Sequence, residues 1–162
     1  MKFSTRARYG LRALIDLGMY SEEESVSLQS IADRQKISMG YLEQLMALLK
    51  KAGYVKSSRG ACGGYRLGKP AEEISVGDIL RTLEGSLAPV KCADGENAGG
   101  CEGAELCVAK FVWKRINDGI TQAVDTLTLG ELIEESIRVR KAAQGAEKTE
   151  RISAGADSQL CK

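Results

Sequence analysis

The chain has 162 residues, of which 43% are hydrophobic and 28% charged, as is ordinary for a folded protein. It contains no apolar run long enough to span a membrane and no signal-peptide pattern, so we expect a cytoplasmic protein rather than a membrane or secreted one. The net charge of +1 is unevenly distributed: residues 1–69 carry 12 lysines and arginines against 6 aspartates and glutamates. A basic first part suits a protein that neutralises phosphates.

The first predicted helix covers Lys2 to Tyr20 and begins at Ser4 or Thr5, because apolar residues recur along one of its sides. Another side of this helix carries arginines, which either contact phosphates or form a solvated basic face. These are Arg6, Arg8 and Arg12.

Residues 27–68 are predicted to form a helix-turn-helix followed by a β-wing. Ser27 and Ser38 can each cap a helix, and the second helix carries a buried stripe at positions i, i+3, i+4 and i+7. Gly53 is expected to end this helix. The glycine-rich run that follows, YVKSSRGACGGYRLG, is typical of two short strands joined by a turn. The buried stripe consists of Leu42, Leu45, Met46 and Leu49.

The first turns of the second helix are the end that a recognition helix inserts into the major groove. Tyr41 and Gln44 can contact phosphates or base edges, and Arg59 near the wing tip is suited to a minor groove. Capped helices and hairpins also occur in proteins that never bind nucleic acid, where such residues belong to an ordinary surface. The complete set of candidate DNA contacts is Ser38, Met39, Gly40, Tyr41, Gln44, Arg59, Gly60, Gly63, Gly64 and Tyr65.

At these residues the sequence resembles the winged-helix bacterial regulators of the IscR type. The resemblance is carried by SIADRQKISMGYLEQLMALLKKAGYVKSSRGACGGYRLGKP, by the opening MKFSTRARYGLRALIDL and by the later ISVGDILRTLEG. It extends from Met1 to about Ile133, and its YLEQL and RG..GGY.L segments are specific. It implies a homodimeric transcription factor that binds double-stranded DNA.

The rest of the chain is expected to add a long dimerisation helix to this mainly α fold with its small β-wing. Ser75 and Asp78 resemble a capping box, so residues 1–84 are interpreted as a winged helix-turn-helix domain. From Leu106 to Leu127 apolar residues recur in steps of three and four, which is a heptad seam. A helix of roughly 30 Å is too long for a small domain to cover. We therefore expect a symmetric homodimer through this helix; the alternative is that it folds back on its own domain.

A final helix is predicted to start at a capping box formed by Thr128 and Glu131. Residues 106–141 thus hold the dimerisation helix and the final helix. Residues 142–162 are small and polar without periodic apolar positions, so we expect disorder there.

Residues 85–105 are predicted to form a loop rich in glycine and cysteine. Cys92 and Cys101 lie in it and Cys107 follows it, separated by eight and five residues. Thiolates bind iron-sulfur clusters and zinc, and a glycine-rich backbone lets three of them converge. The close C-x-x-C pairs of common zinc modules are missing, so three free cysteines in a loop are the alternative.

In the resembled family, three cysteines at this location ligate a [2Fe-2S] cluster, with a histidine three positions after the last cysteine in well-known members. The resemblance therefore implies Cys92, Cys101 and Cys107 as ligands. Here Lys110 stands at the histidine position and the chain contains no histidine, which leaves the fourth ligand open. The candidates are a partner subunit or one of Asp94, Glu96, Glu102, Glu105 and Cys161.

These patterns lead to a homodimeric transcriptional regulator whose operator affinity is controlled by an iron-sulfur cluster. One alternative is a regulator of the same fold that binds zinc or no metal and responds to a small molecule or partner protein. A second is an enzyme with a reactive cysteine, but the chain has no histidine base and no paired-carboxylate or Ser/Lys motif in a pocket-like context.

Overall fold

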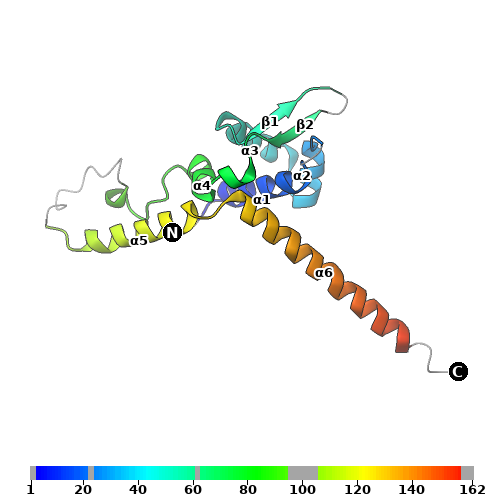
Figure 1. The fold of residues 1–162 in the computed structure, drawn as a ribbon. Coiled ribbons are helices and arrows are strands. Elements are labelled where there is room, and N and C mark those ends of the chain that lie inside the picture. The colour runs from blue at the N-terminus through cyan, green and yellow to red at the C-terminus, as the bar shows by residue number, and fades with distance from the viewer. Residues whose placement is uncertain (1–2, 22–23, 61–62, 95–105, 158–162) are drawn as a thin grey trace.

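The computed structural model describes residues 3–21, 24–60, 63–94 and 106–157. Helices α1 to α4 and the two-stranded wing form a compact body, from which α5 and α6 extend in different directions (Figure 1). The predicted mainly helical fold with a small wing is confirmed. The elements are α1 (Thr5–Tyr20), α2 (Leu28–Gln35), α3 (Met39–Lys51), β1 (Val55–Ser58), β2 (Gly64–Leu67), η1 (Ala71–Glu73), α4 (Val76–Glu84), η2 (Lys91–Ala93), α5 (Ala109–Asp125) and α6 (Leu129–Asp157).

Three serines cap the N-terminal ends of their helices, as the sequence predicts. Their side chains accept hydrogen bonds from backbone N–H groups of the first turn. Ser4 accepts from Arg6 and Ala7, Ser27 accepts from Ser30, and Ser75 accepts from Asp78. Ser38 occupies the N-cap position of α3, but its side chain makes no capping hydrogen bond. Ser38 therefore stands at the expected N-cap position but does not make the expected capping hydrogen bond.

The wing is an antiparallel pair in which Val55 is opposite Leu67 and Ser58 is opposite Gly64. A third segment joins it, because Val26 and Tyr65 exchange two backbone hydrogen bonds of 2.8 and 2.9 Å. A Cβ atom at residue 64 would lie 2.6 Å from the Val26 carbonyl oxygen, so this close approach requires glycine. The wing is thus fixed to the chain that leads into α2.

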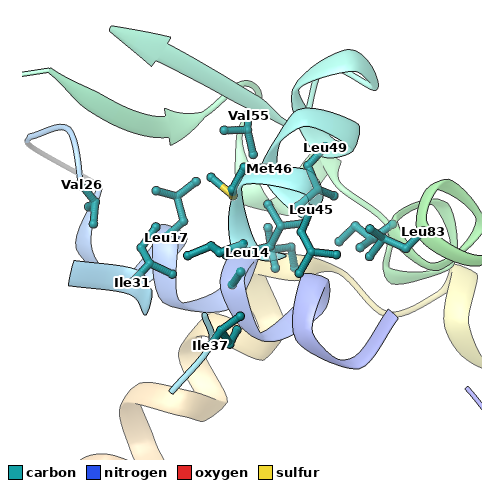
Figure 2. Packing of buried hydrophobic residues seen from close by; sticks show 14 of the residues in the cluster. Leu14, Leu17, Val26, Ile31, Ile37, Leu45, Met46, Leu49, Val55 and Leu83 are labelled. Atoms are coloured by element: carbon teal, nitrogen blue, oxygen red, sulfur yellow. The ribbon is translucent and has the colours of Figure 1, made fainter. Parts of the chain in front are cut away.

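The main core lies around α1, with α2, α3, α4 and the wing packed about it (Figure 2). Leu14 and Leu17 of α1 are completely buried together with Leu45 and Met46 of the predicted α3 stripe. Leu129, the first residue of α6, is also completely buried in this core. The predicted division after residue 84 therefore separates residues that pack together.

The heptad seam of α5 is divided between two environments. Towards its C-terminal end, Ile120 and Leu127 pack against the chain's own second core cluster, which contains Ala7, Val76, Leu80 and Leu87. Towards its N-terminal end, Trp113 is 36% and Ile116 41% exposed. The sequence pattern predicts one continuous seam for a second copy, but α4 and α1 cover part of it because α5 lies against α4 at this end.

Helix α6 continues to Asp157, whereas the sequence analysis predicts disorder from residue 142. Alanine, glutamate, lysine, glutamine and arginine predominate in residues 142–151, and these residues favour a helix even without an apolar stripe. The helix is thus supported by intrinsic propensity where the amphipathic pattern ends. Within the described ranges, no helix combines the length and the apolar character needed to cross a membrane.

Candidate nucleic-acid interface

The first turns of α3 present mainly exposed residues on the side opposite the buried stripe. Ser38, Gly40 and Gln44 are exposed, whereas Met39 is half-buried and packs against the main core. Of the five contacts predicted at the start of α3, Ser38, Gly40, Gln44 and Tyr41 are thus on or near the surface. Met39 contributes mainly to packing. A Cβ at Gly40 would meet no atom within 4 Å, so this position leaves open space on the surface.

Tyr41 is half-buried and held by α1. Its ring packs edge-to-face with the Tyr9 ring, with centroids 6.1 Å apart and planes at 89°, a favourable aromatic geometry. Its hydroxyl group donates to Thr5 Oγ1 over 3.4 Å. Tyr41 therefore does not project freely from the recognition helix, and its phenol group has a defined position beside the start of α1.

The wing places Arg59 at an exposed position. The next residue, Gly60, has a φ of 120°, a backbone conformation that residues other than glycine rarely adopt. Gly63 has a different structural reason, because a Cβ there would lie 2.8 Å from the carbonyl oxygens of Ser58 and Gly60. Tyr65 is half-buried and packs against the main core. Among the predicted wing contacts, Arg59 is thus the exposed cation, while Gly63, Gly64 and Tyr65 build the hairpin.

A surface groove of about 740 Å³ separates the start of α1 from α3. Besides Tyr41 and Gln44 it is lined by Thr5, Arg6, Leu48 and Lys51, which were not predicted as one site. The exposed, off-stripe Leu48 could have indicated this groove, since it lies one position before the buried Leu49. The pairing of α3 with the start of α1 has no local signal in the sequence.

Helix α2 is fixed to α1 by a buried carboxylate. Asp16 is 1% exposed and accepts two hydrogen bonds from Nε of Arg34, at 2.7 and 2.9 Å. Arg34 also stacks on Tyr20, whose hydroxyl accepts a hydrogen bond from Arg140 of α6. Arg12, one of the arginines considered for phosphate contact, instead donates to the carbonyl oxygen and the side chain of Gln35.

The cysteine segment is described only at its two ends. Cys92 lies in η2 and Cys107 just before α5, and both thiols are half-buried. Because η2 packs against α5, these two ends of the segment are held close to one helix. Cys101, Glu96, Glu102 and Glu105 lie outside the described residues, as do Cys62 and Cys161. Within the described ranges, no group of three potential metal-binding side chains is assembled.

The C-terminal end of α5 is clamped to α4. Both terminal guanidinium nitrogens of Arg81, Nη1 and Nη2, contact Asp125 at 2.8 Å, and Arg81 also pairs with Asp78 at 3.2 Å. The hydrogen bond to Asp125 is the largest cause that raises the pKa of Arg81 above its ordinary value. Gly77 leaves room for this contact, because a Cβ there would overlap the Asp125 carboxylate and displace it. The helix that follows Cys107 is therefore joined to the DNA-binding body.

Comparison with known proteins identifies the family. Residues 3–135 match the model of the Rrf2 family, which is described as an iron-dependent transcriptional regulator. This chain belongs to the Rrf2 family of transcriptional regulators. The chain is 43% identical to protein rrf2 of Nitratidesulfovibrio vulgaris over 136 residues, covering 84% of this chain and 89% of that relative. It is 38% identical to the HTH-type transcriptional regulator IscR of Escherichia coli over 133 residues, covering 82% and 80%.

Two solved structures of Rrf2-like regulators are also similar. CymR, the global cysteine regulator of B. subtilis, is 40% identical with a TM-score of 0.70, covering 83% of this chain and 98% of CymR. IscR of T. potens is 42% identical with a TM-score of 0.68, covering 84% and 88%. At this level of likeness the winged-helix fold and the DNA-binding class are shown together, and the class is one of regulators rather than enzymes.

Proposed function

We propose that this Rrf2-family regulator is a homodimer that acts in the cytoplasm, and that an iron-sulfur cluster held by Cys92, Cys101 and Cys107 controls its affinity for an operator. The observation that carries the proposal is the arrangement of the cysteine segment: η2 with Cys92 packs against the helix that begins after Cys107. Control by iron is also consistent with the description of the family.

The donor set fits an iron-sulfur cluster better than a metal that prefers oxygen ligands. Three thiolates are soft ligands, and the glycine-rich backbone between them can donate amide hydrogens to sulfur. The chain has no histidine, so a fourth ligand must be another residue type or come from a partner subunit. Asp94 is half-buried one residue after η2 and is the described carboxylate nearest in sequence to Cys92.

DNA reading is assigned to exposed groups of α3 and the wing. Gln44 and the Tyr41 hydroxyl are suited to phosphates or base edges of a major groove, and Arg59 is suited to a minor groove. The body also presents Lys51 at the end of α3 and Arg6 at the start of α1 on one groove, as expected where a sugar-phosphate strand passes. Base contacts would then supply specificity and these cations would supply the salt-dependent affinity.

The homodimer is proposed to form through the N-terminal part of α5. Val108 is 77%, Phe111 76% and Val112 54% exposed, in addition to the half-exposed Trp113 and Ile116. Each large apolar side chain that leaves water contributes about 1.5 to 3 kcal/mol, and a symmetric contact buries every one of them twice. That sum exceeds the lower estimates of about 4 kcal/mol for the cost of association. The occupant best matched to this repeating apolar face is the same face of a second copy.

Coupling between the cluster segment and DNA is proposed to pass through α5. A [2Fe-2S] cluster would supply a redox-active group and a crosslink across the cysteine segment. The chain's own contribution is α5, which starts next to Cys107 and ends in the Asp125–Arg81 clamp on α4. A change in the order of the segment would thus alter the separation of two recognition helices, and linkage requires that cluster binding and DNA binding affect each other equally.

Anaerobic reconstitution with iron and sulfide tests the proposal. We expect a visible absorption band in the unmodified protein, its loss in the Cys101→Ala variant, and its retention in the matched Cys62→Ala variant. Operator affinity, measured by fluorescence anisotropy, should differ between reconstituted and iron-free unmodified protein and should not differ for Cys101→Ala. Identical affinity for the unmodified protein in both states would refute control by the cluster, whatever the absorption spectrum shows.

One observation favours a second candidate, control by a small molecule. A hollow of about 510 Å³ lies between α1, β2, η1 and α6, and it is lined by both charged and apolar side chains, including Arg66, Glu72 and Ile133. A ligand there would touch the wing and α6 at once. Colourless protein with operator affinity that changes on adding a dialysable cell extract fraction would support this candidate over the cluster.

A further inference from the structure

Glu84, the last residue of α4, completes the N-terminal cap of α1 from 80 residues away. Its Oε1 accepts a hydrogen bond of 2.5 Å from the Ser4 backbone N–H. In a capping box this N–H is bound by a glutamate or glutamine at the third helical position. In α1 that position is Ala7, which has no acceptor and is completely buried against α4. Glu84 therefore supplies the missing carboxylate from a different helix.

Two further contacts fix the same turn of α4 to α1. Leu83 is 1% exposed and packs so closely on Gly10 that a Cβ there would lie 2.5 Å from its Cδ1. The Leu83 carbonyl oxygen accepts from Arg6 Nη1 over 3.5 Å. The carboxylate of Glu84 is also favourable electrostatically, because the N-terminus of a helix carries partial positive charge. The start of α1 is thus held in place mainly by the end of α4.

The start of α1 in turn holds Tyr41. Thr5 Oγ1 accepts from the Tyr41 hydroxyl, and the Tyr9 and Tyr41 rings pack edge-to-face. Thr5 and Tyr9 are four residues apart and therefore lie on one face of α1. If the first turn of α1 frays, the Thr5 contact is lost and the Tyr41 hydroxyl loses the partner that orients it.

We propose that Glu84 is a positioning residue for DNA recognition, acting through Ser4 and Thr5 on the Tyr41 phenol. This inference rests on the proposed role of Tyr41 as a DNA contact. Glu84 itself contacts no DNA. It acts by accepting the hydrogen bond from the backbone N–H of Ser4, the N-cap residue of α1. The consequence is that operator specificity depends on a hydrogen-bond acceptor at the end of α4, a helix that carries no proposed DNA contact.

The experiment compares Glu84→Gln with Glu84→Asp in the full-length, anaerobically reconstituted protein. The glutamine amide oxygen can still accept from Ser4 N–H, whereas aspartate keeps the charge but is one methylene too short to reach. We expect Glu84→Gln to bind within about twofold of the unmodified protein and Glu84→Asp to bind about tenfold more weakly, a difference of about 1.4 kcal/mol. The probe is the duplex that the unmodified protein selects from a random pool, and Glu73→Ala is a matched exposed control.

Two additional measurements separate positioning from general destabilisation. The Ser4 amide proton, observed by ¹⁵N-resolved NMR, should shift in Glu84→Asp and stay nearly unchanged in Glu84→Gln. In a double-mutant cycle, Glu84→Asp should cost much less affinity when Tyr41→Phe has already removed the hydroxyl group. Affinity for duplexes of unrelated sequence should stay the same in all variants.

Several outcomes would overturn the inference while leaving DNA recognition intact. These are equal affinity of Glu84→Asp and unmodified protein, a larger loss for Glu84→Gln than for Glu84→Asp, or additive effects of Glu84→Asp and Tyr41→Phe. If the unmodified protein selects no duplex at all, the proposed function fails first and the positioning role fails with it. Thermal unfolding curves for each variant show that the compared proteins are folded at the assay temperature.

Discussion

Arg34 donates two hydrogen bonds from a single nitrogen to the buried carboxylate of Asp16, which also accepts one from Gln35 Nε2 over 3.2 Å. The two partners are unequal, because the Arg34 side chain is 31% exposed and that of Asp16 is fully buried. Removing the arginine therefore leaves a buried charge with one donor, whereas removing the aspartate leaves a cation that water can reach.

We expect Arg34→Ala to lower the free energy of unfolding by about 3 kcal/mol and Asp16→Asn by less, since removal of one partner of a buried pair leaves the other uncompensated. Urea unfolding followed by far-ultraviolet circular dichroism measures both changes. The matched control is Arg138→Ala, because Arg138 is a 77% exposed arginine of α6. A greater loss for Asp16→Asn than for Arg34→Ala would contradict the argument from burial.

Arg59 is expected to contribute to specific DNA binding from the wing tip. Arg59→Ala should cost about 1 to 3 kcal/mol of operator binding if the guanidinium enters a groove. Arg59→Lys keeps the charge but loses the planar group, so it should recover non-specific affinity more than specific affinity. Anisotropy titrations at two salt concentrations distinguish specific affinity from the salt-dependent, non-specific affinity. An operator isotherm unchanged by Arg59→Ala would place the wing tip away from the DNA.

The exposed part of α5 predicts a change in oligomeric state. Ile116→Glu places a charge on the face proposed to meet a second copy, so sedimentation velocity should show a shift from dimer towards monomer. Val139→Glu is the control, since Val139 is 56% exposed on α6 and lies outside this face. A dimer that survives Ile116→Glu, or dissociates equally with Val139→Glu, would exclude this part of α5 as the interface.

The capping box of α6 predicts a pH dependence of stability. The backbone N–H of Thr128 donates to Glu131 Oε2 at 2.8 Å and its hydroxyl group donates at 3.0 Å, and these bonds lower the pKa of Glu131 below its ordinary value of 4.5. A lowered folded-state pKa stabilises the protein above the unfolded-state pKa and stops doing so as the pH falls through the folded-state value.

The melting temperature of Glu131→Gln should therefore lie below that of the unmodified protein at neutral pH, and the difference should diminish as the pH falls below about 4. Scanning calorimetry over a pH series measures this difference. Glu134→Gln, on the same helix but outside the capping box, should show no such trend. A difference that grows on acidification would have the wrong sign for a capping carboxylate.

The features that the sequence predicts correctly depend on neighbours in the chain. The cap of Ser27 and the reciprocal pair of Thr128 and Glu131 involve residues three apart, and the α3 stripe follows the helical period. Ser38 is different, because the residue type favours a cap but the side chain makes no such bond. Local chemistry thus predicted most helix N-termini and the recognition helix.

Two relationships that the sequence does not predict depend on tertiary contacts. The partial covering of the α5 seam follows from its position against α4, and the position of Tyr41 follows from Thr5 and Tyr9. Neither relationship has a spacing rule that would reveal it in one sequence. The sequence pattern therefore predicts the candidate DNA contacts, but it does not predict the residues that hold them in position.

The burial of Leu129 limits where the chain can be truncated. Because the first turn of α6 returns to the main core, a fragment ending at residue 84 would lack a side chain that fills its interior, and it should not behave as an autonomous folding unit. A shortened version of the protein must therefore keep the start of α6 together with the body formed by α1 to α4.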